Sequence, residues 1–414
     1  MKILEINKFF YKKGGSELYL FSIRNLLKRH GHAVMDFSMN HEKNEPSYYQ
    51  PYFIHPVRMD GKMKLRDKIH SFFHLLYSVE TQEKLEQLIQ ERGVPDVAHI
   101  HNFAYHLTPS ILYVLKKHNI PVVWTLHDYK VISPNYNLYA HGEIDECTKP
   151  DKFFAVVKNK SIKNSYLKSF IAAFEQWLHV KVTKLYGAVD AYVAPSKFLA
   201  NKVIEYGIDA NKVHQIYNTI DISKYKAECL EGEYYIYVGR FIKEKGVMRL
   251  LEAFKELPQQ KLIFIGAGDQ EIEMKKFIAD NEMRNVEILP PIYGAAVYEY
   301  IKKAKALMLT SEWYENNPLV ILDAFALGVP VIGTRIGGIT ELIEDGVNGL
   351  LCEPFDAHSI AQAVKRMETL DHCELGRRAR AFVESIADEE VHYEKIMKVF
   401  EEVISEKKIT NSKN

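Results

Sequence analysis

Long apolar runs, C-x-x-C motifs and net charge are all missing from this chain of 414 residues. No apolar run approaches the ~18 residues that a membrane-spanning helix needs, and the first fifteen residues are too short and too charged for a signal peptide. The four cysteines show no C-x-x-C pair or metal-ligand spacing, so we expect free thiols in a reducing compartment. Basic and acidic residues balance at 54 each, so the overall charge implies no bulk attraction to nucleic acid or to a membrane. Together these absences predict a soluble cytoplasmic protein.

The two halves of the chain differ in charge although the whole is neutral. Residues 1–222 hold 29 Lys and Arg against 22 Asp and Glu, a balance of +7, so residues 223–414 carry −7 from 25 against 32. With 47% hydrophobic residues, a chain of this length can bury two ordinary cores more readily than one very large core.

The second half alternates buried strands with amphipathic helices. The predicted strands are 234–238, 261–266, 286–289, 306–310, 331–334 and 349–352. The predicted helices are 246–257, 271–279, 296–303, 318–327, 340–344, 357–369 and 390–406, followed by a polar tail that we expect to be disordered. This alternation predicts an α/β fold with a parallel, doubly wound sheet.

The first half begins in the same way. The predicted strands are 2–6, 32–37, 95–103, 122–126, 190–194 and 213–217. A loop with Gly14 and Gly15 follows the first of them and opens a helix that runs to about residue 30. Glycines at such a point let backbone N–H groups approach an anion or a sugar, although a plain turn is the simpler explanation of a glycine pair.

The stretch from residue 304 to 349 has the clearest helix signals in the chain. Asn317 is the predicted N-cap of the helix at 318–327, and a proline at the first helical position and a glycine after the last turn complete its boundaries. Glu315 lies in the loop before this helix, at the carboxyl edge of the strands where ligands bind in α/β sheets. Its carboxylate could accept hydrogen bonds from sugar hydroxyl groups. Asp323 lies on the otherwise apolar helix and needs a partner. The alternatives are that Glu315 only caps the helix, and that Asp323 is a buried acid with a hydrogen-bond partner inside the protein.

Two cations follow the first strand of the second half. Arg240 comes directly after Gly239, and Lys245 directly before Gly246. At the edge of a parallel sheet such a pair can clamp a diphosphate. Because exposed Arg and Lys are common, a solvated surface is the alternative.

Two strand ends in the first half carry histidines. His99 and His101 share one strand face, which permits a metal pair, but no third ligand follows at a fixed spacing, so we expect no zinc. We expect His101 and Asn102 to line a cleft instead. His127 and Asp128 end the strand at 122–126, where His127 could donate a hydrogen bond to a sugar or the dipeptide could close a turn.

Two basic segments lie in the first half. Their cations are Lys62, Lys64, Arg66 and Lys68 in the first segment, and Lys158, Lys160, Lys163 and Lys168 in the second. A basic amphipathic segment can lie on an anionic membrane, but a helix packed on its own domain with solvated lysines is the alternative. From the charge asymmetry we expect an acceptor that is anionic, or lipid-linked at an anionic membrane surface.

The residues E-N-N-P-L-V-I-L-D-A-F-A-L-G-V-P-V-I-G-T from Glu315, followed by G-G-I-T-E at 337–341, resemble the E-x7-E signature of retaining family-four glycosyltransferases of the GT-B fold. The family's other motifs have counterparts in G-R-x4-K-G from Gly239, G-G-S-E from Gly14, T-x-H-D ending at Asp128, and N-x-x-D at 218–221. The resemblance covers nearly the whole chain. It departs from the family at Asp323, where a glutamate is usual.

The resemblance implies two Rossmann-like domains that face a cleft. Residues 1–221 would form the N-terminal, acceptor-binding domain, 222–232 the linker, and 233–385 the C-terminal domain that binds a nucleotide sugar. Residues 386–414 would form a C-terminal helix, crossing back to the first domain, and a polar tail.

The resemblance also implies the site residues. The catalytic residues would be Glu315, His127, Arg240 and Lys245. The donor would be bound by Gly15, Gly239, Arg240, Lys245, Glu315, Asn316, Asn317, Leu319, Val320 and Asp323, and the acceptor by Gly14, Gly15, His101, Asn102 and Asp128. Within these sets Glu315 would hold a donor-sugar hydroxyl, and Asp323 the ribose hydroxyls with a shorter side chain than the usual glutamate.

The implied reaction moves a sugar from a nucleotide-diphosphate sugar to a glycan or lipid-linked acceptor, in the synthesis of cell-surface polysaccharide or glycolipid. The chain contains no D-x-D pair, so we expect no metal cofactor and expect the two cations and helix N–H groups to neutralise the leaving diphosphate. A nucleotide-sugar 2-epimerase, which forms product without an acceptor, shares this architecture. A non-catalytic sugar-nucleotide-binding subunit is a further alternative, favoured only by Asp323.

Overall fold

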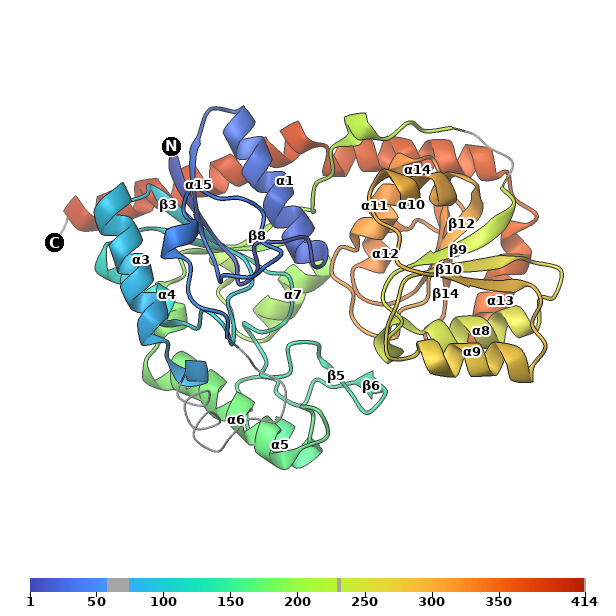
Figure 1. Cartoon of the computed structure of the whole chain (residues 1–414), viewed down its shortest axis with the longest axis horizontal. Coiled ribbons are helices and arrows are strands. Elements are labelled where there is room, and N and C mark those ends of the chain that lie inside the picture. The colour runs from blue at the N-terminus through green and yellow to red at the C-terminus, as the bar shows by residue number, and fades with distance from the viewer. Residues whose placement is uncertain (58–73, 229–231, 413–414) are drawn as a thin grey trace.

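The computed structural model describes residues 1–57, 74–228 and 232–412. These residues form two six-stranded parallel sheets, and Figure 1 shows them side by side with helices around each. The predicted fold class, two doubly wound α/β domains, is confirmed.

The first sheet has the strand order β2-β1-β3-β4-β7-β8. Its strands are β1 (Lys2–Ile6), β2 (Ala33–Phe37), β3 (Val97–Ile100), β4 (Val122–Thr125), β7 (Ala191–Ala194) and β8 (Val213–Gln215). The helices between them are α1 (Gly15–Arg29), η1 (Gln50–Tyr52), α3 (Val79–Arg92), α4 (Ser110–Lys117), α7 (Lys197–Glu205) and η4 (Ala210–Lys212). Alternate residues of β1 pack on opposite faces: Leu4 belongs to one buried cluster and Ile3 to another.

An excursion from the first sheet lies between β4 and β7. It contains the hairpin β5 (Tyr139–Ala140) and β6 (Glu143–Ile144), the helices α5 (Ala155–Asn159) and α6 (Tyr166–Trp177), the π-helix η2 (Leu178–Val182) and the 3₁₀ turn η3 (Leu185–Ala188). Residues 169–186 are thus divided among three elements, α6, η2 and η3.

The second sheet has the order β11-β10-β9-β12-β13-β14. Its strands are β9 (Tyr234–Val238), β10 (Leu262–Ile265), β11 (Val286–Leu289), β12 (Ala304–Leu309), β13 (Val331–Thr334) and β14 (Gly349–Cys352). Its helices are α8 (Val247–Lys255), α9 (Glu271–Asp280), α10 (Ala295–Lys302), α11 (Leu319–Ala326), α12 (Ile339–Leu342) and α13 (Ala357–Met367), with short turns η5 (Ile222–Lys224) and η6 (Lys243–Lys245) before α8.

Each sheet has a point where the direction of winding reverses. In the first sheet this point lies between β1 and β3, and in the second between β9 and β12. Ligands of doubly wound folds bind beyond the carboxyl ends of the strands at such points. The loops after these four strands carry Gly14, His101, Arg240 and Glu315, so the topology places the predicted site residues at the two positions where a ligand is expected.

Two helices end the chain. Figure 1 shows α14 (His372–Ala387) beside the second sheet and α15 (Glu389–Ser412) running back along the first. Ile396 and Phe400 of α15 are buried in the same cluster as Ile3 and Ile23 of the first sheet and its helix. The last helix therefore completes the core on one face of the first sheet.

Two expectations fail in the described residues, and a third falls outside them. The polar tail is helical as far as Ser412 instead of disordered, because it continues α15, and α14 was not predicted at all. Cys147 and Cys352 are free thiols, but Cys373 is disulfide-bonded, so four free thiols is wrong. The basic segment from Lys62 to Lys68 lies outside the described residues. Within the described part of the chain, no helix combines the length and apolar character needed to cross a bilayer.

Candidate active site

Three hydrogen bonds hold the side chain of Glu315 in place at the edge of the second sheet. Its Oε1 accepts hydrogen bonds from Lys245 Nζ (2.5 Å), Ser311 Oγ (2.6 Å) and Trp313 Nε1 (2.8 Å). Burial alone would raise the pKa of the carboxyl, but the Lys245 charge and these three donors outweigh burial and lower it. Glu315 is therefore ionised at neutral pH and fixed in place before any ligand arrives.

Two glycines hold the backbone around Glu315. Gly338 N donates to Glu315 O (2.7 Å), and a Cβ on Gly338 would lie 1.7 Å from the carbonyl oxygen of Asn316. Gly337 has φ +57°, and a Cβ there would lie 2.5 Å from Glu315 O. No larger residue fits at these positions, so the loop before α12 fixes where the Glu315 loop lies.

Arg240 and Lys245 have different surroundings although both follow β9. Arg240 is exposed, and Gly239 beside it lies in the loop that a ligand would reach. Lys245 is only 15% exposed and is engaged by Glu315. A diphosphate at this edge would meet Arg240, which has no ion-pair partner among the described residues, and Lys245, which is shared with Glu315.

The start of α11 differs from the prediction. The helix begins at Leu319 with Pro318 as N-cap, so Asn317 as the N-cap is wrong. Asn317 Oδ1 instead accepts from Asn218 N (3.0 Å), and Asn218 Nδ2 donates to Asn317 O (2.9 Å). Asn317 thus joins the predicted turn at 218–221 to the second sheet, while Leu319 and Val320 remain partly exposed in the first turn of α11.

Asp323 has a protein partner in this structure. Tyr225 donates to Asp323 Oδ1 (2.6 Å), and the Tyr225 hydroxyl also lies 3.0 Å from that of Tyr298. Burial raises the pKa of Asp323 to about 6, although the hydrogen bond from Tyr225 lowers it. The side chain is partly exposed, so a ligand hydroxyl could replace or join Tyr225.

Loops of the first sheet contact the Glu315 region directly. Asn316 Nδ2 donates to the carbonyl oxygen of His127 (3.0 Å), and Tyr129 donates to the carbonyl oxygen of Tyr314 (3.3 Å). A Cβ on Gly15 would lie 3.9 Å from Leu319 Cδ1, so the glycine loop before α1 faces the first turn of α11. The predicted donor residues and the predicted acceptor loops are therefore brought together.

Glu341 was not predicted as a site residue, yet it links the two sheets. Its carboxylate accepts from the backbone N–H of Lys197 (2.8 Å) and Phe198 at the start of α7, and from the Tyr217 hydroxyl (3.2 Å). An acid at a helix N-terminus satisfies free N–H groups and the helix dipole. The G-G-I-T-E motif was the available signal, but nothing in the sequence showed that its acid would cap a helix from the other half.

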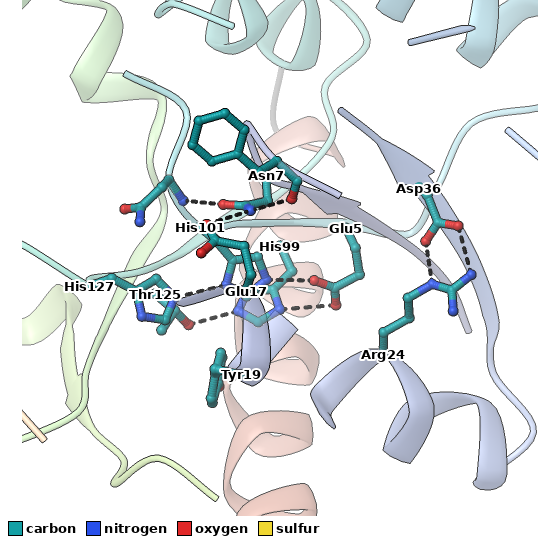
Figure 2. A network of polar contacts seen from close by, with 12 residues as sticks. Glu5, Asn7, Glu17, Tyr19, Arg24, Asp36, His99, His101, Thr125 and His127 are labelled. Atoms are coloured by element: carbon teal, nitrogen blue, oxygen red, sulfur yellow. Dashed lines mark hydrogen bonds and ion pairs between the residues drawn. The ribbon is translucent and has the colours of Figure 1, made fainter. Parts of the chain in front are cut away.

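A buried network lies behind His127 (Figure 2). The two oxygens of Glu5 each bind one ring: His99 Nδ1 at 3.1 Å and His101 Nε2 at 2.7 Å. His101 Nδ1 lies 3.2 Å from His127 Nε2, and His99 Nε2 lies 2.7 Å from the Thr125 hydroxyl. Glu5, His99 and His101 have no exposed surface, so this chain of groups connects the sheet interior to His127.

The network fixes the protons on these rings. Burial would raise the pKa of Glu5, but the His99 charge and the hydrogen bonds from both histidines lower it to about 2, so Glu5 is an acceptor only. His101 must therefore carry its proton on Nε2, and because burial lowers its pKa to about 4, its Nδ1 is bare. His127 then donates through Nε2. Burial also lowers the pKa of His127 well below its usual range, so its Nδ1 is an acceptor at neutral pH.

This proton arrangement corrects two expectations. His101 does not line a cleft, because it is fully buried and acts on His127 from behind. Neutral His127 presents an acceptor to a ligand hydroxyl, whereas the sequence suggested a donor. Neither point could be read from the sequence, since Glu5 lies 94 residues before His99 and shows no ligand spacing to it.

The same three buried groups have metal-ligand chemistry. In the described part of the chain, Glu5, His99 and His101 place one ligand atom each within 4.8 Å of one another. The sequence missed Glu5 as the third member. The direct hydrogen bonds already use one nitrogen of each ring and both carboxylate oxygens, so hydrogen bonding alone accounts for the cluster.

Asn102 and Asp128 lie in the loops that surround His127. Asn102 N donates to Asn7 Oδ1 (3.0 Å), and Lys8 N donates to Asn102 O (2.6 Å), which joins the loops after β1 and β3. Asp128 accepts from Lys130 N (2.9 Å). Burial raises the pKa of Asp128, although the Lys8 charge lowers it. Both side chains are partly exposed and can contact a ligand.

Comparison with known families gives this arrangement a context. The family model described as Glycosyltransferase Family 4 matches residues 13–224, which is half of the chain. The chain belongs to glycosyltransferase family 4. A second model, Glycosyl transferases group 1, matches residues 220–384 of this glycosyltransferase, so the two matches together cover every strand of the two sheets except β1. The enzyme is thus a glycosyltransferase with the GT-B fold.

The relatives and solved structures agree with this assignment. The glycosyltransferase is 26% identical over 83% of its chain, and 87% of the relative, to an uncharacterised 42.6 kDa protein in the cps region of Klebsiella pneumoniae. It is 26% identical over 53% of its chain, and 58% of the relative, to the amylovoran biosynthesis glycosyltransferase AmsK of Erwinia amylovora. The solved structure of Anabaena HepE in complex with UDP-glucose has the same fold, with a TM-score of 0.68, 19% identity, and coverage of 97% of this chain and 100% of that one.

Replacing Asp323 with asparagine should remove the free-energy cost of ionising a carboxyl group at this buried position. The pKa of Asp323 is higher in the folded state than in an unfolded chain, so its contribution to stability is present at low pH and is lost as pH rises from about 4 to about 6. Asparagine keeps an acceptor for Tyr225 without the charge. We expect Asp323→Asn to raise the free energy of unfolding at pH 7.5 by about 1–3 kcal/mol and to leave it unchanged near pH 4.

Chemical denaturation at both pH values measures this difference, and Asp269→Asn, the same change at an exposed acid, is the control. A loss of stability at pH 7.5 would show that the charge on Asp323 is needed in the fold.

His127 should stay neutral as the pH falls from 8 to 5, with its proton on Nε2. In the unfolded protein, histidines titrate near pH 6.5. Because the folded pKa values of His101 and His127 are lower, the folded state should also lose stability as the pH drops below about 6.5. NMR of the protein labelled with ¹⁵N-histidine measures both the ring protonation and the tautomer, and His127→Gln identifies the signal. Titration of His127 near pH 6.5, or a proton on Nδ1, would refute the proton arrangement.

Proposed function

We propose that this glycosyltransferase moves a sugar from a nucleotide-diphosphate sugar, with UDP as the nucleotide, to an acceptor hydroxyl with retention of the anomeric configuration. The observation that carries the proposal is the position of Glu315. It is ionised, bound to Lys245, and lies where loops of both sheets meet, one residue from the Asn316 contact to His127. The solved complex of HepE with UDP-glucose supports the choice of donor.

The donor diphosphate would bind at the edge after β9. Gly239 lets the backbone come close, and Arg240 and Lys245 supply positive charge where the leaving group gains negative charge. The first turn of α11, with Leu319 and Val320 partly exposed, would add free backbone N–H groups. The side-chain oxygen of Asn317 already accepts a hydrogen bond from Asn218 N, so it is not available to the donor. Asn317 would contribute to donor binding only by holding this loop in position.

The chemistry would take place between Glu315 and His127. The bond from the anomeric carbon to the diphosphate oxygen breaks with its electron pair on the diphosphate. The acceptor oxygen forms the new bond on the same face of the sugar and gives its proton to the departing diphosphate. Glu315 would accept a hydrogen bond from one sugar hydroxyl, and His127 Nδ1 from another. Retention of the anomeric configuration is inferred from the family, because no single side chain in the site requires it.

The acceptor would enter from the first sheet, past Gly14 and the loops that carry Asn102 and Asp128. We propose a role in polysaccharide biosynthesis, because relatives include a protein named for amylovoran biosynthesis and another in a cps region. Asp323 would hold the ribose hydroxyls, sharing them with Tyr225.

Arg240→Ala should lower turnover by about 10²–10³ with little effect on stability, because the side chain is exposed and acts on the leaving group. Lys245→Ala should cause a similar loss of turnover and also lower the free energy of unfolding by about 1–3 kcal/mol, since it removes the cation beside the buried Glu315. Adding Glu315→Gln to Lys245→Ala should restore stability without restoring activity.

Steady-state kinetics with a UDP-sugar and chemical denaturation measure the two effects. Lys243→Ala, an exposed lysine in the same turn, is the matched control and should behave as wild type. Full activity of Arg240→Ala with the true donor would disprove the clamp.

Activity should survive chelation. The proposal assigns the leaving-group charge to Arg240, Lys245 and helix N–H groups, and the chain has no D-x-D pair to hold a diphosphate-bridging metal. Initial rates after dialysis against EDTA should match those with added Mg²⁺. A strict requirement for a divalent cation would refute this part of the proposal.

A further inference from the structure

The excursion between β4 and β7 presents an apolar surface to solvent. We call this surface the aromatic face. Its exposed side chains are Phe154, Tyr166, Leu167, Phe170, Trp177 and Val182. Leu167 is 68% exposed, Tyr166 59% and Phe170 48%, on a helix whose opposite side is fully buried. Single exposed apolar residues are ordinary, but a group of this kind on neighbouring turns marks an interaction surface.

Three of the four exposed rings of the aromatic face, those of Phe154, Phe170 and Trp177, form one contiguous group with Phe174. The Phe154 ring lies 6.0 Å from Phe170 and 6.4 Å from Trp177, measured between centroids. Phe174, which is partly buried, lies 6.2 Å from Phe170 and 5.8 Å from Trp177. The rings therefore support one another and present a single surface formed by α5, α6 and η2.

Positive charge predominates around this surface, where one exposed acid, Asp151, pairs with Lys181. Residues 152–184 contain seven lysines and one acid. The lysines are Lys152, Lys158, Lys160, Lys163, Lys168, Lys181 and Lys184. The acid, Glu175, is buried and bound to Lys130 (2.5 Å), so it does not offset them at the surface. Lys160 lies over the Tyr166 ring at 4.5 Å, which brings the charge directly against the apolar group.

We propose that the aromatic face docks on an anionic lipid bilayer. Aromatic rings and a leucine can enter the headgroup region, where their apolar bodies leave water. Lysines beside them gain attraction from anionic lipids, and their long apolar stems can lie along the same boundary. The charge complementarity decides the occupant: a second copy of this chain would bring seven more lysines against the first seven.

Docking would place the acceptor side of the site next to the membrane. Lys130, two residues after Asp128, bonds to Gln176 Oε1 (2.7 Å) on the buried side of α6, and Gln176 Nε2 donates to Lys130 O (2.9 Å). Figure 1 shows α5 and α6 at the outer edge of the first sheet's domain. If the proposed transfer holds, this geometry suits a lipid-linked acceptor, but the docking itself does not depend on the transferase activity.

Flotation with vesicles tests the proposal on the full-length wild-type protein. We expect it to float with vesicles of phosphatidylcholine containing about 30% phosphatidylglycerol, to bind much less to phosphatidylcholine alone, and to dissociate as salt is raised. Leu167→Ser and Phe170→Ser should each lower the partition coefficient at least about tenfold. Lys163→Glu and Lys168→Glu should each lower it at least about fivefold.

Matched controls lie on the second domain. Ile272→Ser and Tyr293→Ser alter apolar side chains that are 83% and 82% exposed, and Lys276→Glu reverses an exposed lysine. These variants should float as wild type. The melting temperature of every variant checks that the fold is kept.

Three results would overturn the proposal. The wild type could fail to float with anionic vesicles, or float equally well with neutral ones. In the third case, the wild type would be a dimer by sedimentation and Leu167→Ser would make it monomeric, which would assign the aromatic face to a second copy of the chain.

Discussion

A carboxylate buried as deeply as that of Glu315 stays ionised only where a cation and hydrogen-bond donors replace the water that it has lost. Lys245, Ser311 and Trp313 provide that replacement, and they come from two different strand-to-loop connections of the second sheet. The positions of Asn316 and of the first turn of α11 follow from this fixed point. The surface that meets the first domain is therefore organised by one electrostatic requirement.

The contacts between the two domains combine hydrogen bonds with an aromatic contact, in which the ring centroids of Phe198 and Tyr314 lie 4.8 Å apart. Asn316 reaches a carbonyl of the His127 loop, Asn218 pairs with Asn317, and Glu341 caps α7. Hydrogen bonds of this type lose little free energy when water replaces them, so they define the relative position of the domains while adding little to the cost of separating them. A site that must admit and release two substrates between its halves needs such a joint.

The strands and the Glu315 unit could be predicted because their signals are local: apolar runs, a proline, a glycine and family motifs all lie within about twenty residues. The hydrogen-bond partners of the site residues could not be predicted in this way. Tyr225 lies 98 residues before Asp323, and Glu5 lies 96 before His101, so only the fold reveals that these groups meet. The long helix α14 was missed although its buried positions Leu375, Ala379, Val383 and Ala387 recur every four residues. Two of the four are alanines, whose small side chains mark an apolar stripe less clearly than Leu or Val does.

The packing of α15 on the first sheet has a consequence for the order in which this protein can be made. Ile396 and Phe400 belong to the core that includes Ile3 and Ile23, so residues synthesised early wait for partners that follow more than 370 positions later. Until then one face of the first sheet is open, while the second sheet, whose strands lie between residues 234 and 352, can already close. The nascent chain would need protection at its beginning for longer than in its middle, and a shortened C-terminus would damage the domain that was synthesised first.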